Sequence, residues 1–266
     1  KNSNPTSFKP RGTVPGDVET GRNSQADAMI EACKLAGTRL IIGHQRRYNA
    51  QYVAAYEALQ AGRIGELLSL ESHGHPGSSL MVDGTHTIDL LRWYAGEGAI
   101  SWVFGQIDTR ESRTAWGTRV ENAAMVMFGL ENGLSALHTN GGAPVAPGDH
   151  PFRSEHTPLW PEALSGQYHR IILRGSEGEI HIDGDWRPAA SPPRKGPLVS
   201  VVRDGQVSEL PAERHEVHSL IVRDLIDCIE SGAPHTLDAH SARATLEVIM
   251  AAYESSRRRA VIPLPL

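Results

Sequence analysis

An Asn-Gly pair at residues 132–133 constrains the fold more than any other feature of this chain. It stands between two strand-like runs, 123–128 and 134–139, and Asn-Gly in that setting is the strongest short-range signal for a β-hairpin. The same pattern recurs twice downstream: residues 169–173 pair with 179–182 around Ser176-Glu177-Gly178, and residues 199–203 pair with 206–210 around Asp204-Gly205. With further strands at 64–72 and 101–107, these pairs predict a mostly antiparallel sheet.

Helical segments with clear boundaries accompany the predicted strands. They are expected at 52–61, 83–95, 216–231 and 240–257. The 83–95 segment is amphipathic and is stopped by Gly96, a residue typical of helix C-termini. The fold class predicted is therefore α/β, with a mixed, mostly antiparallel sheet that carries its helices on one face.

The first part of the chain differs from the rest. Residues 1–24 contain only Phe8, Val14 and Val18 as sizeable apolar residues, so they are expected to be a disordered or foreign leader. A helix at 26–35 and a continuously apolar strand at 39–43 follow, and such a strand is typical of a parallel sheet buried on both faces. No parallel neighbour precedes it, so we interpret this αβ unit as a remnant.

Composition excludes several classes of protein. The chain of 266 residues is 39% hydrophobic and 21% charged and carries a net charge of −5, without a basic face that would favour nucleic acid. No apolar stretch is long enough to span a membrane. The two cysteines, Cys33 and Cys228, lie in helix-like segments and are expected to be reduced core residues, which favours a cytoplasmic location.

Candidate chemistry lies at the start of the 83–95 helix. Asp83 and His86 are three residues apart and so share one side of the first turn. The helix dipole favours the neutral form of a histidine there, and a neutral imidazole beside a carboxylate can accept a proton from a substrate hydroxyl. The alternative is that Asp83 is only an N-cap and His86 only a hydrogen-bonded residue of the first turn.

A metal site is a further alternative for this region. Two histidines and a carboxylate suit zinc or iron, and four candidate ligands are close in sequence: His73, His75, Asp83 and His86. Two histidines two residues apart share a face only on a regular strand, and Gly74 and Pro76 argue against one here. We therefore predict no metal.

The order of elements and several local strings resemble one family, the oxidoreductases named after glucose–fructose oxidoreductase, inositol dehydrogenase and MocA. The strings are residues 26–33 and 43–49, Gly65-Glu66, Asp83-Gly84-Thr85-His86 with the following 87–89, residues 229–234, 253–256 and 264–266. Each string is weakly specific alone. Their order and spacing over about residues 25–266 make the resemblance strong.

The resemblance implies hydride transfer between NAD or NADP and a secondary alcohol of a sugar, cyclitol or related small molecule. It implies that His86 is the proton acceptor and Asp83 its orienting partner. It also places Arg47 and Tyr48 near the cofactor. It implies that His73 and His75 line the substrate side of the site. The irregular 141–167 segment, which contains Trp160, is expected to fold against the active cleft. A homodimer or homotetramer is expected, because the open face of such a sheet can receive a second copy.

The chain departs from the family pattern in two respects. The family more commonly places three residues between the aspartate and the histidine, whereas this chain has only Gly84 and Thr85. The glycine-rich turn that receives a pyrophosphate, Gly-x-Gly-x-x-Gly, is also absent from the sequence. Lys9-Pro10 is the only Lys-Pro pair before the 26–35 helix, and it lacks the glutamate of the family's Glu-Lys-Pro motif.

These features predict three parts: a leader over 1–24, a remnant of a dinucleotide-binding domain over 25–48, and a substrate-binding and oligomerisation domain over 49–266. Two functions stay open. One is an NAD(P)-dependent dehydrogenase that is deficient in its own cofactor site. The other is a non-catalytic module, derived from such an enzyme, that binds a polyol or dimerises. The substrate and the choice between NAD and NADP cannot be read from these residues.

Overall fold

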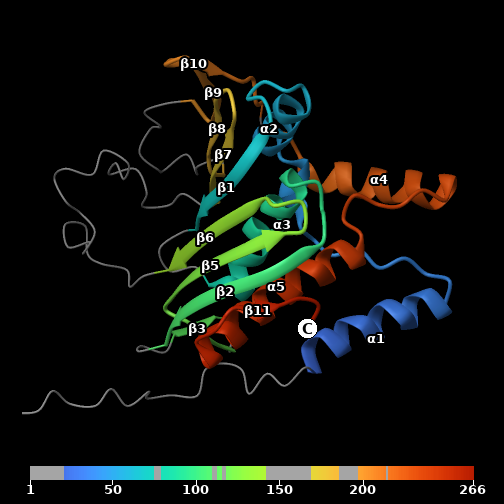
Figure 1. The fold of residues 1–266 in the computed structure, drawn as a ribbon. Helices are drawn as coiled ribbons and strands as arrows, with labels where there is room; N and C mark the ends of the chain where they lie inside the picture. The colour runs from blue at the N-terminus through green and yellow to red at the C-terminus, as the bar shows by residue number, and fades with distance from the viewer. Residues whose placement is uncertain are drawn as a thin grey trace, which may run out of the picture.

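The computed structural model describes residues 21–74, 79–109, 113–115, 118–141, 169–185, 197–213 and 215–266. One sheet of nine strands dominates these ranges, with the strand order β10-β9-β8-β7-β1-β6-β5-β2-β11 (Figure 1). Its strands are β1 (Leu67–His73), β2 (Ile100–Asp108), β5 (Ala123–Leu130), β6 (Ser135–Gly141), β7 (Arg170–Gly175), β8 (Glu179–Asp183), β9 (Val199–Arg203), β10 (Gln206–Glu209) and β11 (Ile262–Pro263). A small separate hairpin joins β3 (Arg113–Ala115) to β4 (Thr118–Val120).

The sheet is mixed and mostly antiparallel, as predicted. Only β1 and β6 run parallel, and the other neighbouring strands pair antiparallel. The three hairpins expected from Asn132-Gly133, residues 176–178 and Asp204-Gly205 are confirmed as β5–β6, β7–β8 and β9–β10. Gly133 has a φ of +88°, the backbone region that its place in the turn requires.

Among the described residues, helices lie on one face of the sheet and none lies on the other (Figure 1). The helices are α1 (Gly21–Leu35), α2 (Ala50–Gln60), α3 (Thr85–Tyr94), α4 (Val217–Ser231) and α5 (Ala239–Arg258). Helix α5 packs on β2, α3 on β1 and β6, and α2 on β8 and β9. The core lies between these layers, and its largest fully buried side chains include Tyr52, Phe128 and Leu90. No helix in the described ranges is both long and apolar enough to cross a lipid bilayer.

The predicted strand at 39–43 is wrong. Within it, only Ile41 forms a β-bridge, an antiparallel one with Asp238, and the segment then enters a 3₁₀ turn, η1 (Gln45–Tyr48). A parallel strand needs a neighbouring strand to complete its hydrogen bonds, and none lies beside it among the described residues. Helix α1 begins at Gly21, five residues before its predicted start, and it packs against α5.

Candidate active site

The start of α3 differs from the regular helix that the sequence predicts at Asp83. Residues Leu80–Gly84 form a π turn, η2, in which the N–H groups of Val82, Asp83 and Gly84 all point at the Ser79 carbonyl oxygen, at 3.2, 3.0 and 2.9 Å. The α-helix begins only at Thr85, and Gly84 occupies its N-cap position. The interpretation of Asp83 as the N-cap is therefore wrong. Its role as the partner of His86 stays a prediction.

His86 lies among imidazoles. Its ring centroid is 5.4 Å from that of His44 and 6.1 Å from that of His169, with the rings nearly perpendicular in both pairs. Burial first, and then the charges of Arg46 and His44, lower the pKa of His86 to about 3, while Asp89 acts in the opposite direction. The neutral form agrees with the sequence-based expectation, although burial rather than the helix dipole is its main cause.

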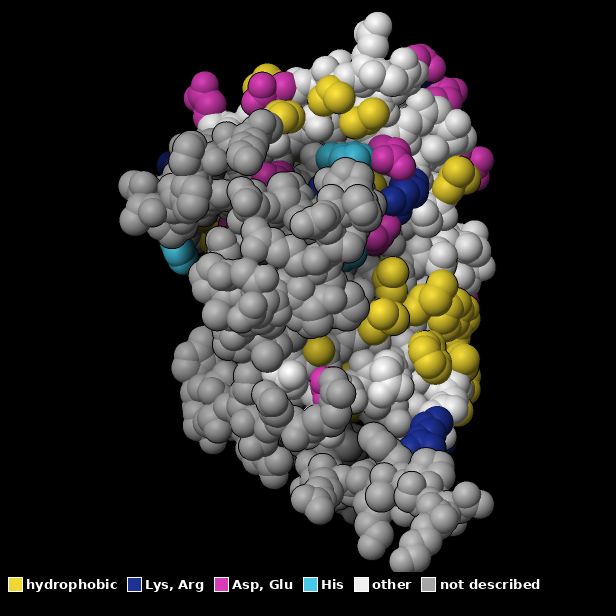
Figure 2. All heavy atoms as spheres, turned by 90° about the vertical axis from the view of Figure 1, so that its left-hand side faces the viewer, with side chains coloured by type: hydrophobic (Ala, Val, Ile, Leu, Met, Phe, Trp, Pro, Cys, Tyr) yellow, Lys and Arg dark blue, Asp and Glu magenta, His cyan; other side chains and the backbone are white. Residues whose placement is uncertain are grey.

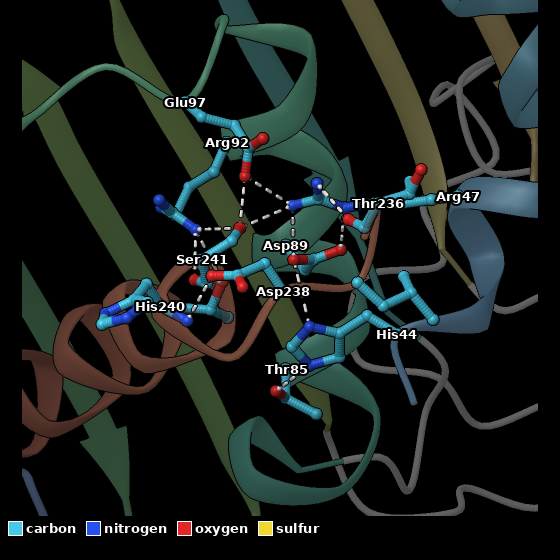
Figure 3. A network of polar contacts seen from close by, with 12 residues as sticks. His44, Arg47, Thr85, Asp89, Arg92, Glu97, Thr236, Asp238, His240 and Ser241 are labelled. Carbon is cyan, nitrogen blue, oxygen red and sulfur yellow. Dashed lines mark hydrogen bonds and ion pairs between the residues drawn. The ribbon is translucent and has the colours of Figure 1, made fainter. Parts of the chain in front are cut away.

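Asp89 is the carboxylate that organises this end of α3 (Figure 3). Its Oδ1 lies 3.0 Å from His44 Nδ1, and its two oxygens accept hydrogen bonds from Arg47 at 2.7 and 2.8 Å. His44 Nε2 lies 3.0 Å from Thr85 Oγ1. An ionised carboxylate can only accept, so Nδ1 of His44 carries a proton and, in the neutral ring, Nε2 accepts from the threonine hydroxyl. Burial would raise the pKa of Asp89, but His44 and Arg47 hold it at about 2.

Arg47 belongs to the same network and is almost fully buried. Besides Asp89, its guanidinium donates to Glu97 at 2.9 Å, to the Ser241 hydroxyl at 3.0 Å and to the Thr236 carbonyl at 3.3 Å. Burial acts to lower the pKa of Arg47, but the two carboxylates raise it above its usual value. These hydrogen bonds make Arg47 a link between η1, α3 and the start of α5. Its predicted contact with a cofactor stays a prediction.

Tyr48, the second residue expected near a cofactor, is tied to α4. Its hydroxyl donates to Asp224, and the His235 ring packs against it at 6.4 Å between centroids. Burial and the Asp224 carboxylate both raise the pKa of this phenol. The cofactor role of Tyr48 stays a prediction as well.

Several residues of the site were missed by sequence reasoning. His169 is fully buried, its Nδ1 is hydrogen-bonded to the Thr87 hydroxyl, and its Nε2 lies 4.0 Å from Asp185. Asp185 in turn accepts from Arg46 at 2.9 and 3.1 Å and from the Tyr52 hydroxyl at 2.7 Å. These residues are far apart in the sequence and come from β7, the end of β8, η1 and α2. No local motif could have joined them.

A hollow of about 630 Å³ adjoins this group of side chains. Gln45 and Asp185 lie on one side of it, and the start of α4, including His215 and His218, lies on the other. Its size is within the range usual for small-molecule pockets. The hollow therefore offers space for a ligand beside the Arg46–Asp185 pair.

His73 is not brought together with His86. Ser72 faces the helix layer, where its hydroxyl contacts His138, so the next residue, His73, points to the open face of β1. There its ring nitrogens lie 2.8 Å from the Thr139 hydroxyl and 2.9 Å from Glu71. Its substrate role stays a prediction. The corresponding expectations for His75 and Trp160 concern residues outside the described ranges, as does Lys9.

The described residues contain no group of three or more histidine, cysteine, aspartate or glutamate side chains arranged to hold a metal ion. The histidines around His86 contact one another, Thr85, Thr87 and Asp89. These contacts bring hydrogen-bonding side chains together around the neutral imidazole of His86.

The mixed, mostly antiparallel sheet with helices packed on one face defines an α/β domain. Residues 56–264 match the family described as "Oxidoreductase family, C-terminal alpha/beta domain", with the short name GFO_IDH_MocA_C. The chain belongs to this family, which confirms the resemblance seen in its sequence. No curated protein matches the chain at a significant level.

Solved structures of oxidoreductases share the fold at low sequence identity. An oxidoreductase from Agrobacterium radiobacter, in complex with NAD+, L-tartaric acid and magnesium, has a TM-score of 0.66 and 17% identity, and the match covers 91% of this chain and 69% of that one. Aldose-aldose oxidoreductase from Caulobacter crescentus, complexed with glycerol, has a TM-score of 0.67 and 18% identity, and the match covers 91% of this chain and 69% of that one. The WlbA dehydrogenase from Bordetella pertussis, in complex with NADH and UDP-GlcNAcA, has a TM-score of 0.62 and 19% identity, and the match covers 92% of this chain and 69% of that one. About a third of each of these proteins thus has no counterpart in this chain.

Proposed function

We propose that this chain is the substrate-binding part of an NAD(P)-dependent oxidoreductase that acts on a secondary alcohol of a sugar, cyclitol or related polyol. His86 is the residue that exchanges a proton with the reacting hydroxyl. The observation that carries the proposal is that this neutral, partly buried imidazole lies next to the rings of both His44 and His169. A neutral imidazole can accept a proton directly, whereas an imidazolium cannot.

The supporting residues act on His86 from two sides. His44 is fixed by Asp89 and Thr85, so its ring presents a defined edge to His86. His169 is fixed by Thr87 and approaches from β7. A pKa near 3 makes His86 a weak base at neutral pH, so a proton reaches it efficiently only if its pKa rises when a substrate replaces the present surroundings. Asp89, ionised and close by, is the group in this chain that favours such a rise.

The substrate class is taken from the relatives. One was crystallised with glycerol, one with L-tartaric acid and one with a uridine-diphosphate sugar acid, and all of these ligands carry hydroxyl groups. The hollow beside Asp185 is large enough for a ligand of sugar size. These points support a polyhydroxylated substrate and do not distinguish one sugar from another.

The described residues do not fit a dinucleotide. A pyrophosphate is held at the N-terminus of a helix that follows a parallel strand and a glycine-rich turn. In the described ranges, the only parallel strand pair is β1–β6, and no Gly-x-Gly-x-x-Gly occurs in the sequence. We therefore assign to these residues substrate binding and proton exchange, and derive no step that passes through NAD or NADP.

A second candidate function is a non-catalytic module that binds a polyol or dimerises. The missing pyrophosphate cradle favours it, as does the low basicity of His86. This candidate keeps the same ligand class and differs in whether the chain itself binds a cofactor.

Titration of the purified chain with NADH, followed by nicotinamide fluorescence, separates the two candidates. Saturable binding in the micromolar range supports the oxidoreductase, and His86→Ala should then abolish polyol oxidation, whereas Asp83→Ala should lower it less. Full activity of the His86→Ala variant would show that His86 is not the residue that exchanges a proton with the substrate. Absence of binding by a chain whose circular dichroism shows it folded would favour the non-catalytic module.

Self-association completes the proposed function. On the open face of the sheet, Phe104 of β2 lies opposite Met127 of β5, and Met125 follows on the same face; these side chains are 39%, 41% and 52% exposed. Figure 2 shows hydrophobic side chains gathered on this side of the molecule. Apolar patches of this kind mark interaction sites. A second copy of the chain is the proposed occupant, and Met127→Lys should lower the mass measured by analytical ultracentrifugation if it is correct. A chain that is monomeric before substitution would refute it.

Both cysteines are unpaired, which supports a reducing cytoplasm as the compartment.

A further inference from the structure

A group of buried polar atoms beside η2 has no hydrogen-bond partner in the described part of the structure. The atoms are Ser79 Oγ, Asn122 Oδ1, His138 Nε2, and both Oδ1 and Nδ2 of Asn140. The four residues are 2%, 8%, 0% and 5% exposed, in that order, so solvent does not reach these atoms. Buried polar atoms are nearly always paired in folded proteins, so several orphans together call for an explanation.

These side chains surround one turn. Helix η2 packs against β6, and a Cβ atom placed on Gly84 would lie 3.3 Å from His138 Nε2 and 3.3 Å from the Ser79 carbonyl oxygen. His138 and Asn140 are two residues apart on β6, so both point at the helix layer. The turn, Ser79 and these two strand residues therefore meet in one place.

Asn122 closes the group on the β5 side. Asn140 lies opposite Ala124, which makes Asn122 its diagonal neighbour on the adjacent strand. The Asn122 carbonyl oxygen also lies so close to Gly141 that a Cβ there would approach it to 2.2 Å. The residue before it, Glu121, accepts a hydrogen bond from the Leu80 N–H and so ties this strand end to η2.

The chemistry of these atoms selects the ligand. A hydroxyl, two amides and an imidazole both donate and accept hydrogen bonds and carry no charge, because burial lowers the pKa of His138 to about 3. The His138 Nδ1 is already 3.0 Å from the Ser72 hydroxyl, which leaves Nε2 for a ligand. Glu121, which accepts a hydrogen bond from the Leu80 N–H, lies at the same turn, and a carboxyl group there disfavours an anion. The ligand groups that best match these four side chains are hydroxyls, because a hydroxyl is neutral and both donates and accepts hydrogen bonds.

We propose that Ser79, Asn122, His138 and Asn140 form a pocket that binds adjacent hydroxyl groups of a neutral polyol. The proposal rests on the proposed function, because these would be the substrate hydroxyls that do not react. His86 follows Gly84 by two residues, and its Nδ1 also has no partner in the described structure, so the candidate proton acceptor lies on α3 directly after the irregular turn. The orphan atoms are shielded from solvent, so η2 must move to admit a ligand. Such π turns are frequent at functional sites.

Ordered water is the competing explanation, since a buried water also satisfies orphan polar atoms. Asn140→Leu separates the two, because leucine has a similar size and no polar atoms. If the amide is unpaired in the empty protein, its removal should raise the urea midpoint of unfolding, whereas loss of an amide that bonds to water should lower it. A lowered midpoint would refute the pocket.

Binding is read from the 15N signals of the His138 imidazole during titration with myo-inositol, without any dinucleotide. We expect a saturable shift in the wild-type chain. In Asn140→Leu the affinity should be about tenfold lower or more, because the variant loses at least one hydrogen bond to the ligand. Ser135→Ala, on the same strand but facing the other side of the sheet, is the matched control and should bind normally. General stabilisation by polyols does not interfere, since it does not saturate at one residue.

The outcomes also separate this pocket from the proposed function. Myo-inositol and glucitol should both shift His138, and gluconate should do so more weakly. If neither neutral polyol shifts the signal, or if gluconate binds better, the pocket is refuted even where NADH binds. If polyols bind but NADH does not, the pocket stands and the oxidoreductase assignment falls.

Discussion

Lowering the pH from 7 to 5 should weaken the folded state through two histidines, the partly buried His86 and the fully buried His138. Burial holds the pKa of each at about 3, against an ordinary value of 6.5. Between these values the unfolded chain binds protons that the folded chain does not, so the free energy of unfolding falls as the pH falls from about 6.5 towards 3. At pH 5 the loss is about 2 kcal/mol for each histidine, or roughly 4 kcal/mol together. Such a loss is a large part of the stability of an ordinary domain.

Urea denaturation at the two pH values measures this loss directly. His138→Gln and His86→Gln should each remove about 2 kcal/mol of the pH dependence, because glutamine does not titrate. His218→Gln is the matched control, since this imidazole is exposed on α4. Asp89 does not confuse the measurement, because its pKa of about 2 keeps it ionised throughout the window. A His138→Gln variant whose stability falls as steeply as that of the wild type would show that this imidazole is not held neutral by the fold, and the reasoning would fail.

Three other perturbations test the rest of the structure. Asp89→Asn leaves the buried Arg47 guanidinium without its main counter-charge and should destabilise the fold by about 3–5 kcal/mol in urea unfolding; a loss below about 1 kcal/mol would contradict the network. Arg46→Gln removes a positive charge that lowers the pKa of His86, so this pKa, followed by NMR, should rise, and an unchanged value would contradict the contribution of Arg46. Gly105→Ala would place a Cβ 2.5 Å from the backbone of α5 and should lower stability by about 1–3 kcal/mol, against no loss if the helix can shift.

The sheet could be predicted because its signals are local. Turn residues such as Asn132-Gly133 and Asp204-Gly205 lie between short apolar runs, and each pair specifies its own hairpin without reference to distant parts of the chain. The segment at 39–43 has an equally strong apolar run but no turn that pairs it. Its state is decided by whether a neighbouring strand exists, which is a property of the whole chain, and in the structure it forms only the bridge from Ile41 to Asp238.

The site was harder to predict because its contacts are distant in sequence. The start of the helix points to His86, but no local pattern singles out Asp89 as the organising carboxylate, because its two partners, His44 and Arg47, lie about forty residues upstream. The π turn at Leu80–Gly84 also shifts the helix start, so that Asp83 leaves the N-cap position that its spacing suggested. A one-residue irregularity of this kind has no signature in composition or periodicity.

The buried network and the orphan atoms both adjoin the start of α3, and their contrast explains how one helix start can be both rigid and adaptable. Asp89, His44 and Thr85 satisfy each other's hydrogen bonds, so moving them would expose a buried charge. His138 Nε2 and the Asn140 amide form no such bonds, so displacing η2 gives up the hydrogen bond from the Leu80 N–H to Glu121 but none from these atoms. A ligand that enters beneath η2 would gain hydrogen bonds that the empty protein lacks, while the network keeps α3 and His86 in place. The irregular turn is therefore where substrate recognition and proton exchange would be coupled.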